Sequence, residues 1–211
     1  CSDRKLIPLA EVLRYHPSLE VLYLSYNRLA SAVPLGLALS TNTTLRELHL
    51  DHNRLTSDCA IAIAQGLSQN SHHTKLAVLC LNSNSLGDRG GAAIASMLKV
   101  NTSITTLQLA KNELGATTAQ MLGESLQHNV TLLELGIDQN PDLPQEEKGQ
   151  ILYLVRANRA GRYLLRHHQQ QPSHATPPLG LWPRVLARLE LDLMYFFLHE
   201  APSITAMAIT T

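Results

Sequence analysis

Three side chains of types that bind metal ions in proteins alternate along one short segment of the chain. These are Glu47, His49 and Asp51, and His52 follows directly. Alternate residues of an extended strand point to the same side, and carboxylate and imidazole groups are common zinc ligands. No nearby cysteine or second histidine on that side completes a set of ligands. The pattern therefore predicts an ordinary polar surface, with no metal ion and no cofactor.

The three cysteines, Cys1, Cys59 and Cys80, follow no recognisable pattern. Their odd number and wide spacing argue against a disulfide framework and favour a reducing compartment, so we expect a cytoplasmic protein. We expect Cys80 to be a passive thiol on a polar surface. The sequence contains no nucleophile elbow, Walker loop or dinucleotide fingerprint, which favours a protein without catalysis of its own.

The charge balance bears on the kind of partner. The chain has 17 basic and 17 acidic residues and a formal net charge of zero, so it has no general attraction to nucleic acid or anionic membranes. Its most apolar stretch, residues 179–198, is interrupted by Arg184, Arg188, Glu190 and Asp192, which argues against a membrane span. We therefore expect the partner to be another protein.

One pattern of apolar residues and asparagine occurs five times along the chain. It reads L-x-x-L-x-L-x-x-N-x-L, with isoleucine at some leucine positions, and the copies begin at residues 19, 45, 76, 104 and 132. A period of about 28 residues is typical of leucine-rich repeats, and five copies in register make the pattern specific.

Each copy predicts a short strand followed by a helix. The leucines at the fourth and sixth positions alternate inward on a strand, and the asparagine turns the chain away and can bond the backbone of adjacent coils. These structural asparagines are Asn27, Asn53, Asn84, Asn112 and Asn140. Apolar residues four apart then mark a helix. A further asparagine closes each helix, where we expect the left-handed conformation of a helix end.

Two of the repeats depart from this spacing. The first is two residues short and has Pro34 in its helix segment, so we expect a shortened helix there. The second carries three extra residues around His72, His73 and Thr74, which we expect to bulge before the third strand.

A 28-residue repeat with a full helix resembles the ribonuclease-inhibitor-like subfamily of leucine-rich repeat proteins, over about residues 1–160. That group includes ribonuclease inhibitors, activators of the Ran GTPase, tropomodulins and the sensor ends of NOD-like receptors. The resemblance implies an α/β fold: a curved solenoid with a parallel sheet on the concave side and helices on the convex side. It is specific for the fold and says little about function.

The repeat pattern also suggests how the chain is organised. We expect a leucine-rich-repeat domain over residues 1–166, a polar linker over 167–178, a C-terminal helical segment over 179–200 and a disordered tail over 201–211. An open solenoid end needs covering, so the segment with Trp182 is expected to form a helical cap on the last repeat. The alternative is that it docks a partner.

The concave face is the candidate site for a protein partner, because the side chains that flank the inward leucines point there. Its candidate residues are Tyr23, Tyr26, Glu47, His49, Asp51, His52, Cys80, Asn82, Gln108, Lys111, Glu134 and Asp138. We therefore expect a non-catalytic protein-interaction module, a scaffold type of protein. Two alternatives stay open: a regulatory protein that activates a small GTPase, and the ligand-sensing end of a larger immune receptor.

Overall fold

The computed structural model describes residues 3–159 and 162. Contacts divide the chain into two units, Cys1–Val155 and Arg156–Thr211, and the fold described below is that of the first unit. Helices and strands alternate along the described residues: α1 (Asp3–Tyr15), β1 (Val21–Tyr23), α2 (Val33–Leu39), β2 (Glu47–His49), α3 (Ser57–Gln69), β3 (Val78–Cys80), α4 (Gly87–Met97), β4 (Thr106–Gln108), α5 (Ala116–His128), β5 (Glu134–Gly136) and α6 (Gln145–Arg159).

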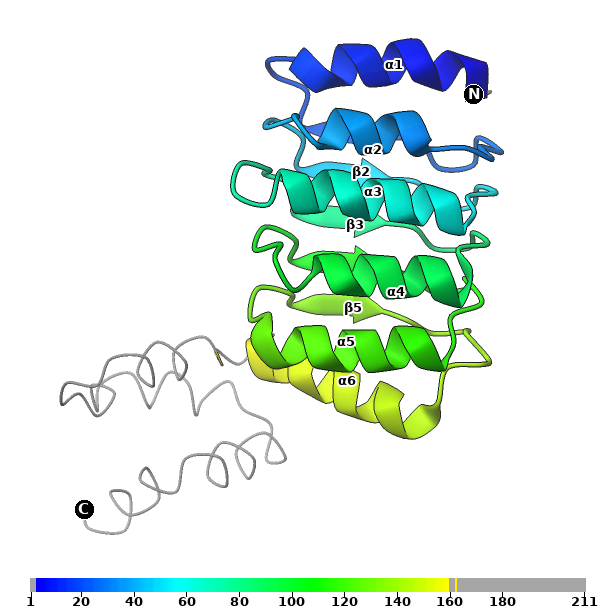
Figure 1. The fold of residues 1–211 in the computed structure, drawn as a ribbon, viewed down its shortest axis with the longest axis vertical. Helices are drawn as coiled ribbons and strands as arrows, with labels where there is room; N and C mark the ends of the chain where they lie inside the picture. The colour runs from blue at the N-terminus through cyan, green and yellow to red at the C-terminus, as the bar shows by residue number, and fades with distance from the viewer. Residues whose placement is uncertain (1–2, 160–161, 163–211) are drawn as a thin grey trace, which may run out of the picture. The chain divides into compact units, whose positions relative to one another are not determined.

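The strands form one parallel sheet in the order in which they occur along the chain, β1-β2-β3-β4-β5. Equivalent positions of successive repeats pair directly, so that Leu48 lies opposite Leu79, and Leu79 opposite Leu107. The helices α1 to α5 are stacked in a parallel layer against the sheet (Figure 1). The predicted alternation of strands and helices in a leucine-rich-repeat fold is confirmed.

The core lies between the sheet and the helix layer. Leu48, Leu79 and Leu107, at the middle of three strands, are fully buried, as are Ile63 and Ile94 from the helices. Each fully buried leucine or isoleucine favours folding by roughly 1.5–3 kcal/mol relative to an exposed side chain. The same positions recur in every repeat, so one continuous core runs along the unit.

The asparagine that follows each strand bonds the backbone of its neighbours. Asn53 accepts a hydrogen bond from the Leu29 amide (3.0 Å) and donates from Nδ2 to the carbonyls of Leu24 (3.0 Å) and Leu50 (2.8 Å). Asn84 repeats this arrangement one coil further on, with the Leu55 amide as its donor. These bonds satisfy backbone groups that leave the sheet and are buried from water.

A second ladder of asparagines closes the helices, and here one sequence prediction is wrong. Asn42, Asn70, Asn101 and Asn129 are buried, and none of them has the positive φ that we expected. Instead, Asn70 donates to the carbonyls of Leu39 and Asn42. Two repeats later, Asn129 donates to the carbonyls of Leu98 and Asn101 in the same way. Asn42, Asn70 and Asn129 thus join successive coils at the second edge of the solenoid, whereas the Asn101 side chain, among the described residues, bonds only groups of its own turn, so an ordinary backbone conformation is sufficient.

A left-handed backbone conformation occurs at the residue directly before each asparagine that follows a strand. Repeat after repeat, the residue at this position has a φ between 54° and 60°: Tyr26, His52, Ser83, Lys111 and Gln139. The sharp turn away from the sheet requires this conformation, which is uncommon for residues other than glycine. It places these side chains at the same edge of the sheet.

Helix α5 is capped by a side chain from the preceding repeat. Its N-cap residue is Gly115, which has no capping side chain, and Asp88 on α4 takes over this role. The Asp88 carboxylate accepts hydrogen bonds from the amides of Gly115 (3.0 Å), Thr117 (3.1 Å) and Thr118 (2.7 Å). Burial alone would raise the pKa of Asp88, but these hydrogen bonds outweigh it and lower the pKa to about 2.

The irregular repeats behave as their spacing predicts. Helix α2 has only 7 residues and begins beside Pro34. After α3, the amides of His73 and Thr74 both turn back to the Asn70 carbonyl, which forms the expected bulge.

The C-terminal predictions concern other residues. The linker over 167–178, the helical cap over 179–200 and the tail over 201–211 lie outside the described residues, as does the boundary at residue 166. Within residues 3–159 and 162, no helix combines the length and apolar character needed to cross a bilayer.

Candidate functional site

The face of the sheet that the helices leave uncovered carries the candidate residues, and we call it the open face. It corresponds to the concave face expected from the sequence. In β2 to β5 the middle residue is buried toward the helices, and in β1 the middle residue Leu22 is partly buried. The two neighbours of the middle residue are less buried in β2, β4 and β5. The turn residues that follow, Tyr26, His52 and Lys111 among them, extend the same surface.

Two tyrosine–histidine pairs lie at the β1–β2 end of this face. Tyr23 stacks on His49 with ring centroids 4.5 Å apart and an interplanar angle of 20°, and Tyr26 stacks on His52 at 4.3 Å and 10°. Both tyrosines remain largely exposed, at 70% and 74%. Stacking holds their rings in fixed positions while leaving one ring face free for contact.

The polar residues of β2 and of the segment that follows it are held by hydrogen bonds. Glu47 Oε2 lies 3.2 Å from His49 Nε2, so the imidazole donates its Nε2 proton to the carboxylate. Asp51 Oδ1 accepts from the Asn82 amide at 2.9 Å, and Asp51 Oδ2 accepts from the Ser25 hydroxyl at 3.3 Å. Asp51 therefore ties three repeats together, and it is half-buried.

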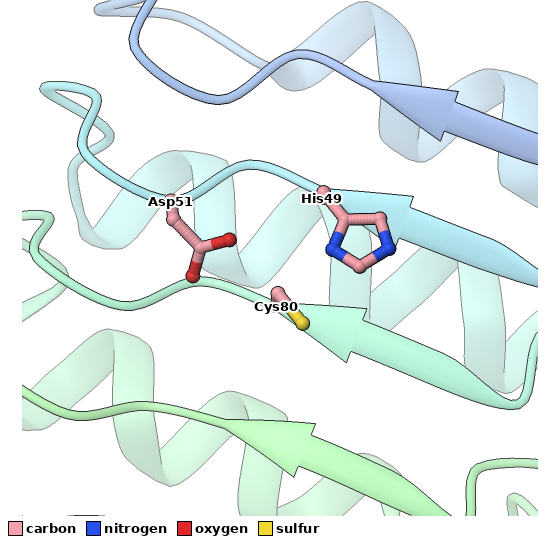
Figure 2. A group of neighbouring side chains, drawn as sticks. All are labelled: His49, Asp51 and Cys80. Carbon is pink, nitrogen blue, oxygen red and sulfur yellow. The ribbon is translucent and has the colours of Figure 1, made fainter.

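Cys80, which the sequence placed on the same face, forms a cluster with His49 and Asp51, although no set of ligands was expected there. It lies directly opposite His49 in the sheet register. One potential ligand atom from each of His49, Asp51 and Cys80 lies within 4.8 Å of the other two. Figure 2 shows the three side chains around one point, with one ring nitrogen of His49 on the side of Asp51 and Cys80. The expectation that no nearby cysteine completes a set of ligands overlooked Cys80, which comes from the next repeat and lies beside His49.

Cys80 is also more enclosed than the passive surface thiol that we expected, since only 9% of it is exposed. Burial raises the pKa of the thiol to about 11, and the negative charges of Asp51, Glu47 and Glu134 add to this effect. At neutral pH the thiol is therefore protonated and a poor nucleophile. The buried Cys59 is likewise a free cysteine.

The β4–β5 end of the open face has contacts of a different kind. Gln108 donates to Glu134 at 3.0 Å, and Asn82 Oδ1 accepts from the Ala110 amide at 2.8 Å. Asp138 pairs with Lys148 of α6 at 2.8 Å, so its charge is partly compensated. Lys111 is exposed. This end of the face therefore offers amide and charged groups, whereas the β1–β2 end carries the stacked aromatic rings.

Two residues outside the candidate list also contribute to this face. Ser25 bridges β1 and β2 through Asp51, accepting from the Asp51 amide at 3.1 Å and donating to its carboxylate. Lys148 neutralises Asp138 from the first turns of α6. The signal for Ser25 was available, because it occupies the same repeat position as Asp51 and Asn82. Nothing in the repeat pattern pointed to Lys148.

Comparison with protein families agrees with this fold. Models described as leucine-rich repeat match residues 18–39, 41–64, 72–95 and 100–123. With the sheet register and the asparagine ladder, these matches define the chain as a leucine-rich repeat protein. Folds of this class are typically non-catalytic.

Two solved structures show the same architecture. One, described as actin-binding site 2 of leiomodin-1, aligns with a TM-score of 0.64 and 23% identity, covering 76% of this chain and 93% of that one. The other is the tropomodulin C-terminal domain from Caenorhabditis elegans, with a TM-score of 0.62 and 16% identity, covering 78% of this chain and 99% of that one. At these identities the likeness concerns the fold.

Proposed function

We propose that this protein is a non-catalytic protein-interaction module that binds another protein on its open face. The observation that carries the proposal is the pair of stacked tyrosines, Tyr23 and Tyr26, which are 70% and 74% exposed. Exposed aromatic side chains held in one position lose little entropy on binding, and tyrosine is enriched among the residues that dominate interface energies.

The negative charges on the same face favour a partner with donor groups. Glu47, Asp51 and Glu134 place carboxylates on the same face, close enough to Cys80 to influence its thiol. A complementary surface would present lysine, arginine or backbone amides there, which would steer association and fix the orientation of the complex.

Actin is the first partner to test, because the similar leiomodin-1 structure is that of an actin-binding site. We further propose that the repeats are of the ribonuclease-inhibitor-like type, in support of which α3 and α5 are full helices of 13 residues each. The free cysteines Cys59 and Cys80 support a reducing compartment such as the cytoplasm.

The test compares the two tyrosines with a third tyrosine elsewhere. Tyr15 ends α1 in the helix layer and is 76% exposed, so it is a matched control. Wild type, the double variant Tyr23→Ser/Tyr26→Ser and the control Tyr15→Ser are titrated with monomeric actin and co-sedimented with filaments. We expect wild type and control to bind alike and the double variant to bind at least tenfold more weakly, since losing one interface anchor costs about 2 kcal/mol.

The two parts of the proposal fail separately. If wild type does not bind actin, actin is the wrong partner. The open face is then tested by quantitative affinity capture with the same three proteins. If no captured protein depends on Tyr23 and Tyr26 more than on Tyr15, the open face is not the interaction surface.

A further inference from the structure

Three ligand types meet at one point of the open face, beyond what the proposed function requires. His49 at the end of β2, Asp51 two residues later and Cys80 at the end of β3 lie with their ligand atoms within 4.8 Å of one another (Figure 2). A thiol, an imidazole and a carboxylate in one place are the three main protein ligands of zinc. The parallel register brings them together, because it sets His49 opposite Cys80.

The imidazole of His49 is already oriented as a ligand. Its Nε2 is engaged by Glu47 Oε2 at 3.2 Å, which leaves Nδ1 as the nitrogen with a lone pair. In Figure 2 the ring nitrogen bonded to Cγ, which is Nδ1, lies on the side of Asp51 and Cys80. A carboxylate on the far nitrogen is the usual companion of a metal-bound histidine, because it fixes the tautomer and the ring orientation.

From this geometry we infer that His49 Nδ1, Asp51 Oδ2 and Cys80 Sγ form a binding site for a zinc-type divalent cation, with Glu47 as the residue that orients His49. Three protein ligands leave the fourth position of a tetrahedral zinc ion open to water or to a partner's side chain. A soft thiolate together with imidazole favours zinc over magnesium or calcium, which prefer oxygen ligands.

The rearrangement that binding requires is small. Zinc bonds of about 2.0–2.3 Å place neighbouring ligand atoms of a tetrahedron about 3.5 Å apart. Side-chain rotations must therefore close separations of up to 4.8 Å by about 1 Å. Asp51 Oδ1 can keep its bond from the Asn82 amide, because Oδ2 has only the long 3.3 Å contact with Ser25. On binding, the Cys80 thiol releases its proton to solvent.

The experiment uses the full chain, freed of metal, and Co²⁺ as a spectroscopic substitute for Zn²⁺. Cobalt bound by cysteine shows a thiolate charge-transfer band, and tetrahedral cobalt shows strong ligand-field bands. The test variants are Cys80→Ser and His49→Gln. The matched controls are Cys59→Ser, at the other described cysteine, and His52→Gln, at the neighbouring stacked histidine. Circular dichroism without metal verifies that each variant is folded.

We expect one cobalt per chain with a cysteine charge-transfer band in wild type and in both controls. The affinity should fall at least tenfold in His49→Gln, and the band should disappear in Cys80→Ser. A band that persists in Cys80→Ser, or the absence of a cysteine band in wild type, would overturn the inference.

A measurement on the unaltered protein keeps the test decisive if a variant does not fold. Zn²⁺ should slow the alkylation of Cys80 by iodoacetamide, read by peptide mapping, and leave the rates of Cys1 and Cys59 unchanged. Equal Cys80 alkylation with and without Zn²⁺ would contradict the site. Because these experiments need no partner protein, they are independent of the proposed function.

Discussion

The asparagines that follow the strands occupy equivalent positions, but we expect their replacement by alanine to lower the free energy of unfolding by unequal amounts. Asn53, Asn84 and Asn112 occupy the same position of successive repeats and are 9%, 7% and 0% exposed. Replacing each by alanine removes the same atoms from nearly the same depth. Differences among the three variants therefore report how many backbone groups each asparagine alone satisfies.

The hydrogen bonds rank the three positions. Asn53→Ala removes the acceptor of the Leu29 and Asn27 amides and the donor to the Leu24 carbonyl. Asn84→Ala leaves the Leu55 amide without its acceptor. The Leu50 and Leu81 carbonyls that Asn84 also contacts keep bonds from Asn53 and Asn112.

Asn112 is the mildest case. Its Oδ1 is buried with no hydrogen-bond partner among residues 3–159 and 162. The carbonyls of Leu81 and Leu109, to which its Nδ2 donates, keep bonds from Asn84 and Asn140. Asn112→Ala thus removes an unsatisfied oxygen and strands no backbone group that these bonds identify.

The expected magnitudes follow from the cost of a stranded buried polar group, about 1–3 kcal/mol. Relative to Asn112→Ala, the free energy of unfolding should be about 1–3 kcal/mol lower for Asn84→Ala, which strands one group. It should be about 2–6 kcal/mol lower for Asn53→Ala, which strands the Leu29 amide and the Leu24 carbonyl and also removes the bond of the less buried Asn27 amide.

Equilibrium urea unfolding followed by circular dichroism, at equal slopes, measures these differences. The order of stability should be Asn112→Ala, then Asn84→Ala, then Asn53→Ala. Equal losses at all three positions would show that burial of the asparagine, and not the backbone groups it satisfies, determines the cost.

Three further outcomes are expected. Gly66→Ala should lower the free energy of unfolding by about 1–3 kcal/mol, because the added Cβ would meet the backbone of Gly36 in the preceding helix. Gly123→Ala has open space around the added Cβ and should leave the free energy of unfolding unchanged or raise it by up to about 1 kcal/mol, as thermal melts of both variants would show. Asp88→Asn should cost about 1 kcal/mol at neutral pH, more than the exposed Asp58→Asn. Folding lowers the pKa of Asp88 from 3.8 to about 2, so the stabilisation by its carboxylate is complete above pH 4 and is lost as the pH falls to 2. The stabilities of wild type and Asp88→Asn should therefore converge near pH 2. A difference in stability that stays constant with pH would contradict the capping role. Iodoacetamide should alkylate Cys80 slowly at pH 8, with a rate still rising above pH 9, whereas a plateau near pH 9 would refute the raised pKa.

Much of the fold could be predicted from local pattern. Alternation of leucines predicted the strands, spacing of four predicted the helices, and Pro34 with the missing residues predicted the short α2. These features depend on the residues within a single repeat, and the same pattern occurs five times in the sequence. The open-face residues also follow from alternation, since a side chain next to an inward leucine must point outward.

The closing asparagines show where pattern alone was insufficient. Their position at a helix end favoured a left-handed cap, since asparagine tolerates that conformation. In the structure the side chain of Asn70 reaches the carbonyls of Leu39 and Asn42 in the preceding coil. Satisfying buried carbonyls was worth more than the local preference, and the distance between coils cannot be read from one repeat.

The sequence by itself determined that His49, Asp51 and Cys80 lie on one face, since each flanks or follows an inward leucine. The repeat alignment also places Cys80 next to His49, but only the tertiary structure decided that the ligand atoms of all three come within 4.8 Å of one another, because that distance depends on side-chain conformations and on the hydrogen bonds that hold Asp51 and His49. The same holds for Asp88, whose carboxylate reaches the amides of α5 across a loop and a strand. Hydrogen bonds within a repeat follow from periodicity, whereas contacts between repeats depend on how the shared core sets the spacing and stagger of whole coils.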